Sequence, residues 1–319
     1  MSYVDKARKD ALLKYKKPYY TLPRRDKLDA EMTCLVTDYF TKSEIGRPFE
    51  ARGLIVTGES RSGKSREITE IVGKFNTEGN ILPNGQPARF VQCSLSSMLT
   101  WKDLGIKVLE AMGYPMNASR TQSYIWQQVT QQARLQGVIG IHFDECQHMF
   151  TDTAKTTNAK VLDGFKALCK NDAWPFAIIL SGVPVLTKFV YGHDQLWLIS
   201  NKVHLDLIDR QADMKDLNDL CFAYADVGGI KFEPMALRSF YEKLAFSGGY
   251  RWGLVIEILI EALVICELDG QAEINIVHFE KAFANKTGIA YGYSPFSMED
   301  YEDAFSEAEI VRLLTRSDP

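Results

Sequence analysis

The sequence predicts an α/β domain built on a parallel sheet of five strands, followed by a smaller domain made only of helices. Two observations carry this prediction. Apolar, strand-like runs alternate with amphipathic helical segments from about residue 28 to residue 212. From about Asp213 onward the pattern changes to helices alone. Such alternation is typical of a doubly wound sheet, in which ligands bind at the carboxyl ends of the strands.

The predicted elements follow one another at regular spacing. Each strand is a short apolar run bounded by turn residues or helices. The strands are expected at 54–56, leading into Gly58, and at 89–94, 138–143, 176–180 and 202–207. The helices of the first domain are expected at 28–45, after residue 65, and at 104–112, 122–135 and 161–169. The later helices are expected at 214–225, 234–245, 251–266 and 276–283.

Composition narrows the class of protein. The 319 residues are 46% hydrophobic and 24% charged, as in a globular protein with a sizeable core. The net charge of −4 gives no global signal for nucleic acid or membrane, so an anionic partner must be met by a local patch. The six cysteines are scattered without a C-x-x-C pair, which disfavours a disulfide framework or a zinc site.

Two further features bear on location. The N-terminus carries charges throughout and has no apolar core of the signal-peptide kind. The longest apolar stretch, 253–266, is interrupted by Glu257 and Glu261. It therefore predicts a buried helix and not a membrane span. We expect a cytoplasmic protein with reduced cysteines and no membrane partner.

Charge is distributed unevenly, and this suggests the domain boundaries. Residues 1–30 carry nine Lys or Arg against four Asp, whereas residues 296–319 carry seven acids against two Arg. We expect four parts, namely a basic N-terminal arm (1–28), an α/β domain (29–212), a helical domain (213–295) and an acidic tail (296–319). The arm either packs on the first domain or contacts nucleic acid or a partner.

A complete phosphate-binding motif follows the first strand. The sequence GESRSGKS fits G-x-x-x-x-G-K-[ST]. Glycines at both ends let backbone N–H groups turn toward phosphate oxygens, and the following helix points its positive end at the same anion. Lys64 is expected to contact the β- and γ-phosphates, and Ser65 to contact Mg²⁺. The predicted ATP-binding residues are Gly58, Glu59, Ser60, Arg61, Ser62, Gly63, Lys64 and Ser65.

Two acids end the third predicted strand. Asp144 and Glu145 close the apolar run that begins at Val138. At this place Asp144 can hold Mg²⁺ together with Ser65. Glu145 can orient and deprotonate the attacking water. We therefore predict catalytic roles for Glu145 and Lys64, and metal binding by Ser65 and Asp144.

Two further residues are candidates for the same site, and each has a structural alternative. Ser181 follows the fourth strand, where a polar side chain would sit beside the γ-phosphate; alternatively it caps the next helix. Arg251 stands in the first turn of a helix, where a cation opposes the helix dipole and so suggests an anionic partner. That partner is either the γ-phosphate or an acid in a structural salt bridge.

Taken together, these motifs resemble AAA+ ATPases, and more narrowly the transposition regulators of the TniB and TnsC type. The resemblance covers about residues 30–296. Its general parts are the phosphate loop, the DE of IHFDE, Ser181 and the GGYR at 248–251. Its narrower parts include RFVQCSLSSMLTWKDLGIKVLEAMGYP, the DECQH run, ILSGVPVL, DQL and SPF, in the order that the family has them.

The resemblance implies an ATP-dependent oligomer, a ring or a filament, that assembles on double-stranded DNA and delivers target DNA to a transposase. It implies a P-loop AAA+ domain followed by a helical lid domain. It also implies DNA contacts from two loops that precede helices, and a second, weaker option is Lys155 with Lys160. The DNA-binding candidates at the corresponding positions are Trp101, Lys102, Arg120 and Thr121.

One departure from the family concerns the arginine finger. Where the family usually has an Arg-Arg or Arg-Phe pair, this chain reads LISNKV. Lys202 supplies a charge there but not the planar contact of arginine. Either hydrolysis is slow, or Arg210 or another residue serves.

Two other functions remain open at this point. A nucleotide-gated protein-interaction switch, of the signalling or phage-defence kind, would explain the weak basic character and the acidic tail. A small-molecule kinase is the less favoured alternative, since the helical C-terminal region fits a lid domain better than an acceptor pocket.

Overall fold

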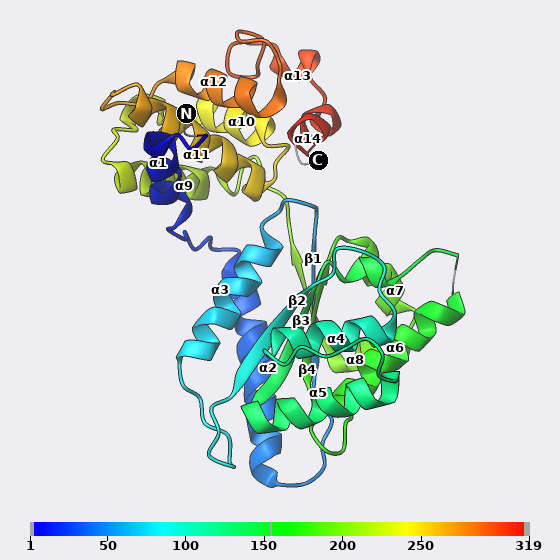
Figure 1. Ribbon diagram of the computed structural model, residues 1–319. Helices are drawn as coiled ribbons and strands as arrows, with labels where there is room; N and C mark the ends of the chain where they lie inside the picture. Colours follow the sequence, from blue (N-terminus) through cyan, green and yellow to red (C-terminus); the bar gives the residue numbers. More distant parts are fainter. Residues whose placement is uncertain (1–2, 154, 316–319) are drawn as a thin grey trace. The chain divides into compact units, whose positions relative to one another are not determined.

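Residues 3–153 and 155–315 of the protein are described from a computed structural model (Figure 1). Contacts between residues divide the chain into two units. The α/β unit comprises 24–60 and 64–205. The helical unit comprises the described residues of 1–23, 61–63 and 206–319. Each unit is described below by itself.

Five parallel strands form the sheet of the α/β unit, as the sequence predicts. Their order across the sheet is β2-β3-β4-β1-β5, so the first strand lies between the fourth and the fifth. β1 and β4 are buried along their whole length. The strands are β1 (Gly53–Gly58), β2 (Arg89–Ser94), β3 (Val138–Asp144), β4 (Ala177–Gly182) and β5 (Ser200–Leu205).

Helices cover both faces of this sheet (Figure 1). One face packs against α2 (Arg25–Ile45) and α3 (Lys64–Thr77). The other face packs against a larger set. That set is α4 (Trp101–Ala111), α5 (Gln122–Gln136), the short η1 (Cys146–Met149), α6 (Lys155–Cys169), α7 (Val185–Tyr191) and α8 (Asp194–Ile199).

An extra residue in β3 decides which side chains face α3. Arg89 pairs with Val138 but Phe90 pairs with Gly140, which leaves Ile139 as the additional residue. Because successive side chains of a strand point to opposite faces, one inserted residue shifts the alternation. Ile141 and Phe143 consequently join the core on the α4 side, whereas His142 and Asp144 face α3.

In the α/β unit the largest differences from the predictions concern α6, α7 and α8. α7 and α8 were not predicted, because helices of seven and six residues are too short to display a helical period. α6 begins at Lys155, before the predicted start at 161. The prediction missed its first turns because they are polar and show no apolar period. There the Asn158 side chain bonds both backbone groups of Thr151, which ties the preceding loop to the helix.

The helical unit is built around α11 (Trp252–Leu268), which is buried on most sides. Its core is aromatic and aliphatic, with Phe232, Phe279 and Phe283 fully buried. This confirms the predicted helical C-terminal region. The other elements are α1 (Lys6–Lys16), α9 (Met214–Gly228), η2 (Glu233–Met235), α10 (Arg238–Ser247), α12 (Ile276–Thr287), α13 (Tyr301–Ala304) and α14 (Glu307–Thr315).

Both charged ends of the chain contribute to this helical core. In α1, Tyr15 is fully buried and its hydroxyl donates to Glu267 at 2.8 Å, while Arg8 makes two hydrogen bonds to Glu261 at 2.7 and 2.9 Å. At the other end, Phe305 and Ile310 are buried in the same core. The last four residues of the predicted tail lie outside the described residues.

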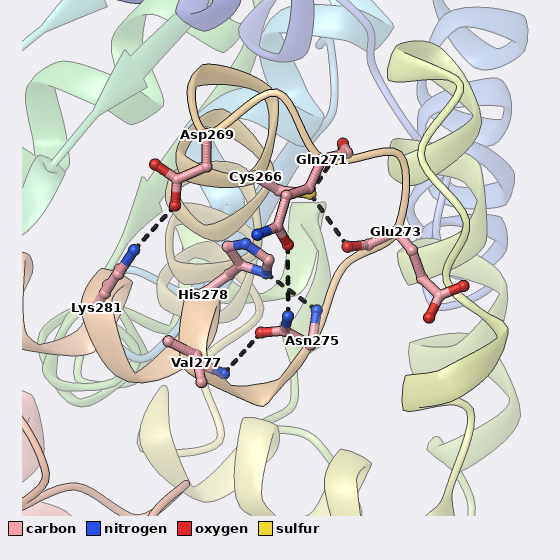
Figure 2. Close-up of polar contacts among 8 residues, drawn as sticks. All are labelled: Cys266, Asp269, Gln271, Glu273, Asn275, Val277, His278 and Lys281. Carbon is pink, nitrogen blue, oxygen red and sulfur yellow. Dashed lines mark hydrogen bonds and ion pairs between the residues drawn. The ribbon is translucent and has the colours of Figure 1, made fainter.

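The connection from α11 to α12 is held by side chains that bond to backbone (Figure 2). The Asn275 side chain accepts from the backbone N–H of Val277, and Nδ1 of His278 accepts from the backbone N–H of Asn275 at 3.0 Å. The Asn275 side chain also accepts from the backbone N–H of His278, so Asn275 and His278 form a capping box at the start of α12. Lys281 adds an ion pair to Asp269 at 2.8 Å.

The helical unit is expected to lose stability in acid through His278. Burial lowers the pKa of this imidazole, and Nδ1 can accept the Asn275 N–H only while it is unprotonated. The unfolded chain takes up the proton first as pH falls below about 6.5, so folding stability is lost below that value and is present above it. A loss of about 1 kcal/mol is expected, as for a helix cap.

Urea unfolding at pH 7.5 and pH 5.5 measures this loss. His278→Gln is the matched variant, because glutamine also suits this position of a capping box and does not titrate. We expect the variant to lose less stability than the natural chain between the two pH values. Equal losses would show that His278 does not carry the effect.

No helix within residues 3–153 and 155–315 combines the length and the apolar character that a membrane crossing needs.

Candidate functional site

The phosphate loop joins β1 to α3. β1 ends at Gly58 and α3 begins at Lys64. Arg61 and Gly63 have φ of 61° and 97°, the left-handed backbone that lets a short loop turn. Residues 59 and 60 group with the α/β unit, and residues 61–63 with the helical unit.

Lys64 is a buried cation at the start of α3. Its side chain is 3% exposed, and Nζ donates to the carbonyls of Gly58 and Glu59 at 2.9 Å each. Burial lowers the pKa of this amine, while Glu145 and Asp144 act in the opposite direction. Both acids that the sequence predicted for this site therefore act electrostatically on the Lys64 ammonium.

Asp144 is oriented by two donors. Its Oδ1 accepts from the Ser181 hydroxyl at 2.6 Å and from the backbone N–H of Glu145 at 3.0 Å. No other described residue hydrogen-bonds this carboxylate. One oxygen is thus engaged by the protein, and Oδ2 is left for another ligand.

Glu145 is held by a residue that the sequence analysis did not select. Gln147 donates from Nε2 to Oε2 of Glu145 at 2.5 Å, and its Oε1 accepts from the backbone N–H of Val183 at 3.3 Å. A Cβ on Gly182 would lie 2.3 Å from that Oε1, so the close approach needs glycine there. Glu145 itself has a φ of 56°.

Ser181 lies inside β4 and is fully buried. The helix that follows, α7, is preceded by Pro184, so Ser181 does not cap it. Its hydroxyl contacts Nε2 of His142 at 2.7 Å as well as Asp144. The structure therefore brings Lys64, Asp144, Glu145 and Ser181 together at the carboxyl ends of three neighbouring strands.

His142 is a second residue that the sequence analysis missed. It is 1% exposed, and Nδ1 lies 3.2 Å from the Gln92 side-chain amide of β2. Burial lowers the pKa of its imidazole to about 4. A polar residue inside the apolar run VIGIHFD was the signal that could have found it.

The donor set fits a magnesium ion that arrives with a nucleotide. Among the described residues, no group of three or more His, Cys, Asp or Glu could hold a metal by itself. Mg²⁺ usually keeps several waters and takes one or two carboxylates plus substrate phosphates. Asp144, with its available oxygen, and the hydroxyl of Ser65 at the start of α3 match that pattern.

Arg251 belongs to the helical unit and stands at the N-cap of α11. Its Nη1 donates to the carbonyl of Gly249 at 2.8 Å and lies 3.6 Å from Glu307. Glu307 is thus a structural acid partner of the kind that the sequence suggested, within the same unit. The separation of 3.6 Å is longer than a hydrogen bond, so this ion pair is weak.

The two arginine-finger candidates are both engaged within the chain. Lys202 donates to the carbonyl of Trp197 at 2.6 Å and lies 4.2 Å from the centre of that indole ring. Arg210 pairs with Glu302 at 2.7 Å and stacks over Tyr250 at 4.8 Å.

The four predicted DNA contacts lie at the starts of two adjoining helices. Thr100 and Asp103 form a capping box at the start of α4, where Trp101 and Lys102 are the first residues. Thr121 caps α5 and accepts from Tyr124 at 3.4 Å, and Arg120 lies over the Tyr124 ring at 5.3 Å. The two helix starts meet, because Trp126 donates to the carbonyl of Trp101.

Trp101 is packed among other aromatic rings. It stacks on Trp126 with ring centres 4.7 Å apart and meets Phe165 edge-on at 5.2 Å. A Cβ on Gly164 would lie 2.6 Å from the Trp101 ring, so glycine there makes room for it. The indole therefore contributes to the core beneath the helix starts.

Replacing Trp101 by alanine is expected to lower the free energy of unfolding by about 3 kcal/mol, as for a large aromatic removed from a core. Lys102→Ala, one residue along and partly exposed, should change it by less than about 0.5 kcal/mol. Urea denaturation followed by circular dichroism measures both. Equal stability of Trp101→Ala and the natural chain would mean that the indole is free for another role.

A family model described as an AAA domain matches residues 47–190, which include the phosphate loop, both acids and Ser181. A comparison with curated protein sequences gives no match.

Solved structures give the fold of almost the whole chain. The ORC2 protein of Aeropyrum pernix in its ADP form has a TM-score of 0.60 at 13% identity, covering 94% of this chain and 86% of that one. Cdc6p from Pyrobaculum aerophilum has a TM-score of 0.58 at 12% identity, over 88% and 70%. The ORC1 protein of Aeropyrum pernix in complex with DNA has 0.57 at 10% identity, over 87% and 69%. The chain has an AAA+ P-loop fold with a helical C-terminal part.

Proposed function

We propose that this chain binds and hydrolyses ATP with Mg²⁺ and assembles on double-stranded DNA as an oligomer while ATP is bound. We further propose that it regulates transposition by selecting target DNA and by recruiting or activating a transposase. The observation that carries the ATPase part is the meeting of Lys64, Asp144 and Glu145 at the carboxyl end of the sheet, beside a complete phosphate loop.

Each residue of the site has a role in this proposal. The backbone of residues 58–63 and the ammonium of Lys64 bind the phosphates, and Ser65 with Asp144 holds the metal. Mg²⁺, when bound, neutralises charge on the β- and γ-phosphates. Glu145 orients the attacking water and accepts its proton, and Gln147 fixes the orientation of Glu145. Ser181 and Arg251 are proposed to respond to the γ-phosphate.

The DNA part is supported by local charge and helix geometry. Lys102 and Arg120 flank two helix N-termini, whose positive ends and backbone N–H groups suit phosphate oxygens. Solved structures of the same fold include Drosophila ORC bound to DNA. Transposition is supported by the resemblance to the TniB and TnsC type, through WKDLGIKVLEAMGYP and the DECQH run.

Removing the charge of Lys102 or of Arg120 is expected to weaken retention of duplex DNA. Lys102→Ala and Arg120→Ala should each lower affinity at low salt, with nucleotide binding unchanged, and reduce the slope of affinity against salt by about one. Filter retention with a non-hydrolysable ATP analogue at two salt concentrations measures this. Arg134→Ala is the control, an exposed cation in the last turn of the same helix that Arg120 precedes.

If neither cation matters more than Arg134, the proposed DNA surface is wrong. If the natural chain retains no DNA with any nucleotide, the DNA part of the proposal fails as a whole.

The second candidate is a nucleotide-gated protein-interaction switch. A cavity of about 540 Å³ in the helical unit favours it, because five of its lining residues are acids and only two are arginines. The acids are Glu242, Glu299, Asp300, Glu302 and Asp303. Nucleotide-dependent capture of a basic protein, without DNA retention, would favour this function over the first.

A further inference from the structure

We propose that His142 is a positioning residue for Asp144. In this proposal it fixes the Ser181 hydroxyl, and thereby turns one oxygen of the Asp144 carboxylate toward a nucleotide-bound magnesium ion. The inference rests on the proposed nucleotide site and deepens it.

The first step is where the hydroxyl proton goes. A serine hydroxyl has one proton to donate and accepts through its lone pairs. Ser181 Oγ lies 2.6 Å from Asp144 Oδ1 and 2.7 Å from His142 Nε2. Since the carboxylate can only accept, the proton of Ser181 points to Asp144. The contact with His142 then needs a proton on Nε2.

The second step is that the ring is held in the orientation that supplies this proton. Nδ1 of His142 lies 3.2 Å from Oε1 of Gln92, and the same oxygen accepts from the Thr69 hydroxyl of α3 at 3.0 Å. The oxygen and the NH₂ group of an amide exchange places on a half-turn, so Gln92 can also donate to an unprotonated Nδ1. With the amide turned in this way, the neutral ring carries its proton on Nε2, where Ser181 accepts it.

The third step concerns the carboxylate. The terminal torsion of an aspartate side chain has only a broad preference, so the group turns freely unless donors hold it. Ser181 and the backbone N–H of Glu145 both donate to Oδ1. Oδ2 receives no hydrogen bond from any described residue and stays available to a metal ion or its water.

The fourth step is that packing alone does not call for histidine here. The ring is 1% exposed in a strand whose neighbours Ile141 and Phe143 are fully buried. A buried polar group costs free energy unless it is hydrogen-bonded, and an aliphatic side chain would fill the space without that cost. Both ring nitrogens have partners, which is the pattern expected of a side chain that orients another group.

The bulge at Ile139 makes the chain of hydrogen bonds possible. If β3 paired regularly through Ile139, without the bulge, His142 and Asp144 would both face α4, on the opposite side of the sheet from α3. Gln92 of β2 lies beside His142 of β3, and Ser181 of β4 stands two residues beyond Ile179, the register partner of His142. From there the Ser181 hydroxyl reaches both His142 and Asp144. We call Gln92, His142, Ser181 and Asp144 the relay, which runs across three neighbouring strands.

The test separates metal binding from nucleotide binding and from folding. Affinity for a fluorescent ADP analogue is measured in EDTA and in excess Mg²⁺, and the ratio gives the contribution of the metal. His142→Leu is expected to lower this ratio at least about tenfold, as loss of a partner of a metal-binding carboxylate does, with affinity in EDTA unchanged. Ser181→Ala is expected to lower the ratio to a similar extent. His142→Gln carries an N–H group at a comparable reach and should restore most of the ratio.

Two control variants set the limits of the expected change in this ratio. Asp144→Asn should abolish the metal contribution. Asn158→Ala removes a buried side chain whose hydrogen bonds to described residues are all to the backbone of Thr151, and it should leave the ratio unchanged. If His142→Leu does not fold, Ser181→Ala and His142→Gln still decide the matter.

Each outcome has one meaning. If folded His142→Leu or Ser181→Ala has the same ratio of affinities as the natural chain, the relay is overturned. If Asp144→Asn at the same time loses the gain in affinity from Mg²⁺, the proposed nucleotide site still stands. A normal ratio in Asp144→Asn overturns the relay, since Asp144 then holds no metal. If the natural chain shows no gain from Mg²⁺ at all, the proposed function and the relay fall together.

Discussion

A Glu145→Gln variant is expected to bind ATP as tightly as the natural chain and to hydrolyse it at least about 100-fold more slowly. The expectation follows from general base catalysis, which contributes about 10² to 10⁴ in rate and which an amide cannot supply. Glutamine keeps the size of the side chain and can still hydrogen-bond Gln147. The ATP-bound assembly should therefore accumulate and persist.

Phosphate release and retained radiolabelled ATP, measured on the same sample, test this variant. His148→Ala is a suitable control, because it changes an exposed side chain three residues further along the same segment. An unchanged rate in Glu145→Gln would show that the proton is accepted elsewhere, and the assignment of this glutamate would have to be abandoned.

A Lys64→Ala variant is expected to lose measurable nucleotide binding. The ammonium is almost fully buried and sits between the carbonyls of Gly58 and Glu59, so no other cation of the loop can take its place by a change of rotamer. A buried ion contact that loses one partner costs about 3–5 kcal/mol, which corresponds to more than 100-fold in affinity.

Titration with a fluorescent ATP analogue measures the loss. Lys74→Ala, an exposed lysine near the other end of α3, controls for the loss of a positive charge on that helix. Folding of Lys64→Ala is checked by circular dichroism. Binding within threefold of the natural chain would mean that the phosphates lie elsewhere.

The sequence alone predicted the sheet and the phosphate loop well, because both depend on local patterns. The run GLIVTGESRSGKS contains a buried strand, two glycines for the turn and the first residues of a helix within one short stretch. All five strands were predicted within two or three residues of their observed bounds. Local pattern and tertiary position agree at these places.

Elements set by tertiary packing were harder to predict. α7 and α8 are too short to show a period. They are helical because Leu186 and Val190 of α7 meet the core beside β1 and β4, and Leu196 of α8 meets it beside α6 and β5. Residues 1–28 and 296–319 were predicted from their charge as a basic arm and an acidic tail, yet Tyr15 and Ile310 are fully buried in the helical unit. Charge content described their surfaces and not their packing.

The supporting residues of the site could not be predicted from one sequence. Gln147 reaches Val183, and His142 reaches Gln92 and Ser181, each across neighbouring strands. These contacts depend on strand order and on the bulge at Ile139, neither of which the sequence reveals. The acids Asp144 and Glu145 were predicted because they follow directly on an apolar strand.

The central claim is that the ATP-bound form assembles on DNA. Gel filtration with a non-hydrolysable ATP analogue, with and without duplex DNA and at two salt concentrations, tests it most directly. We expect a large oligomer only when nucleotide and DNA are both present, and we expect it to dissociate at the higher salt concentration. A particle whose size does not respond to DNA would contradict the claim and favour the protein-interaction switch.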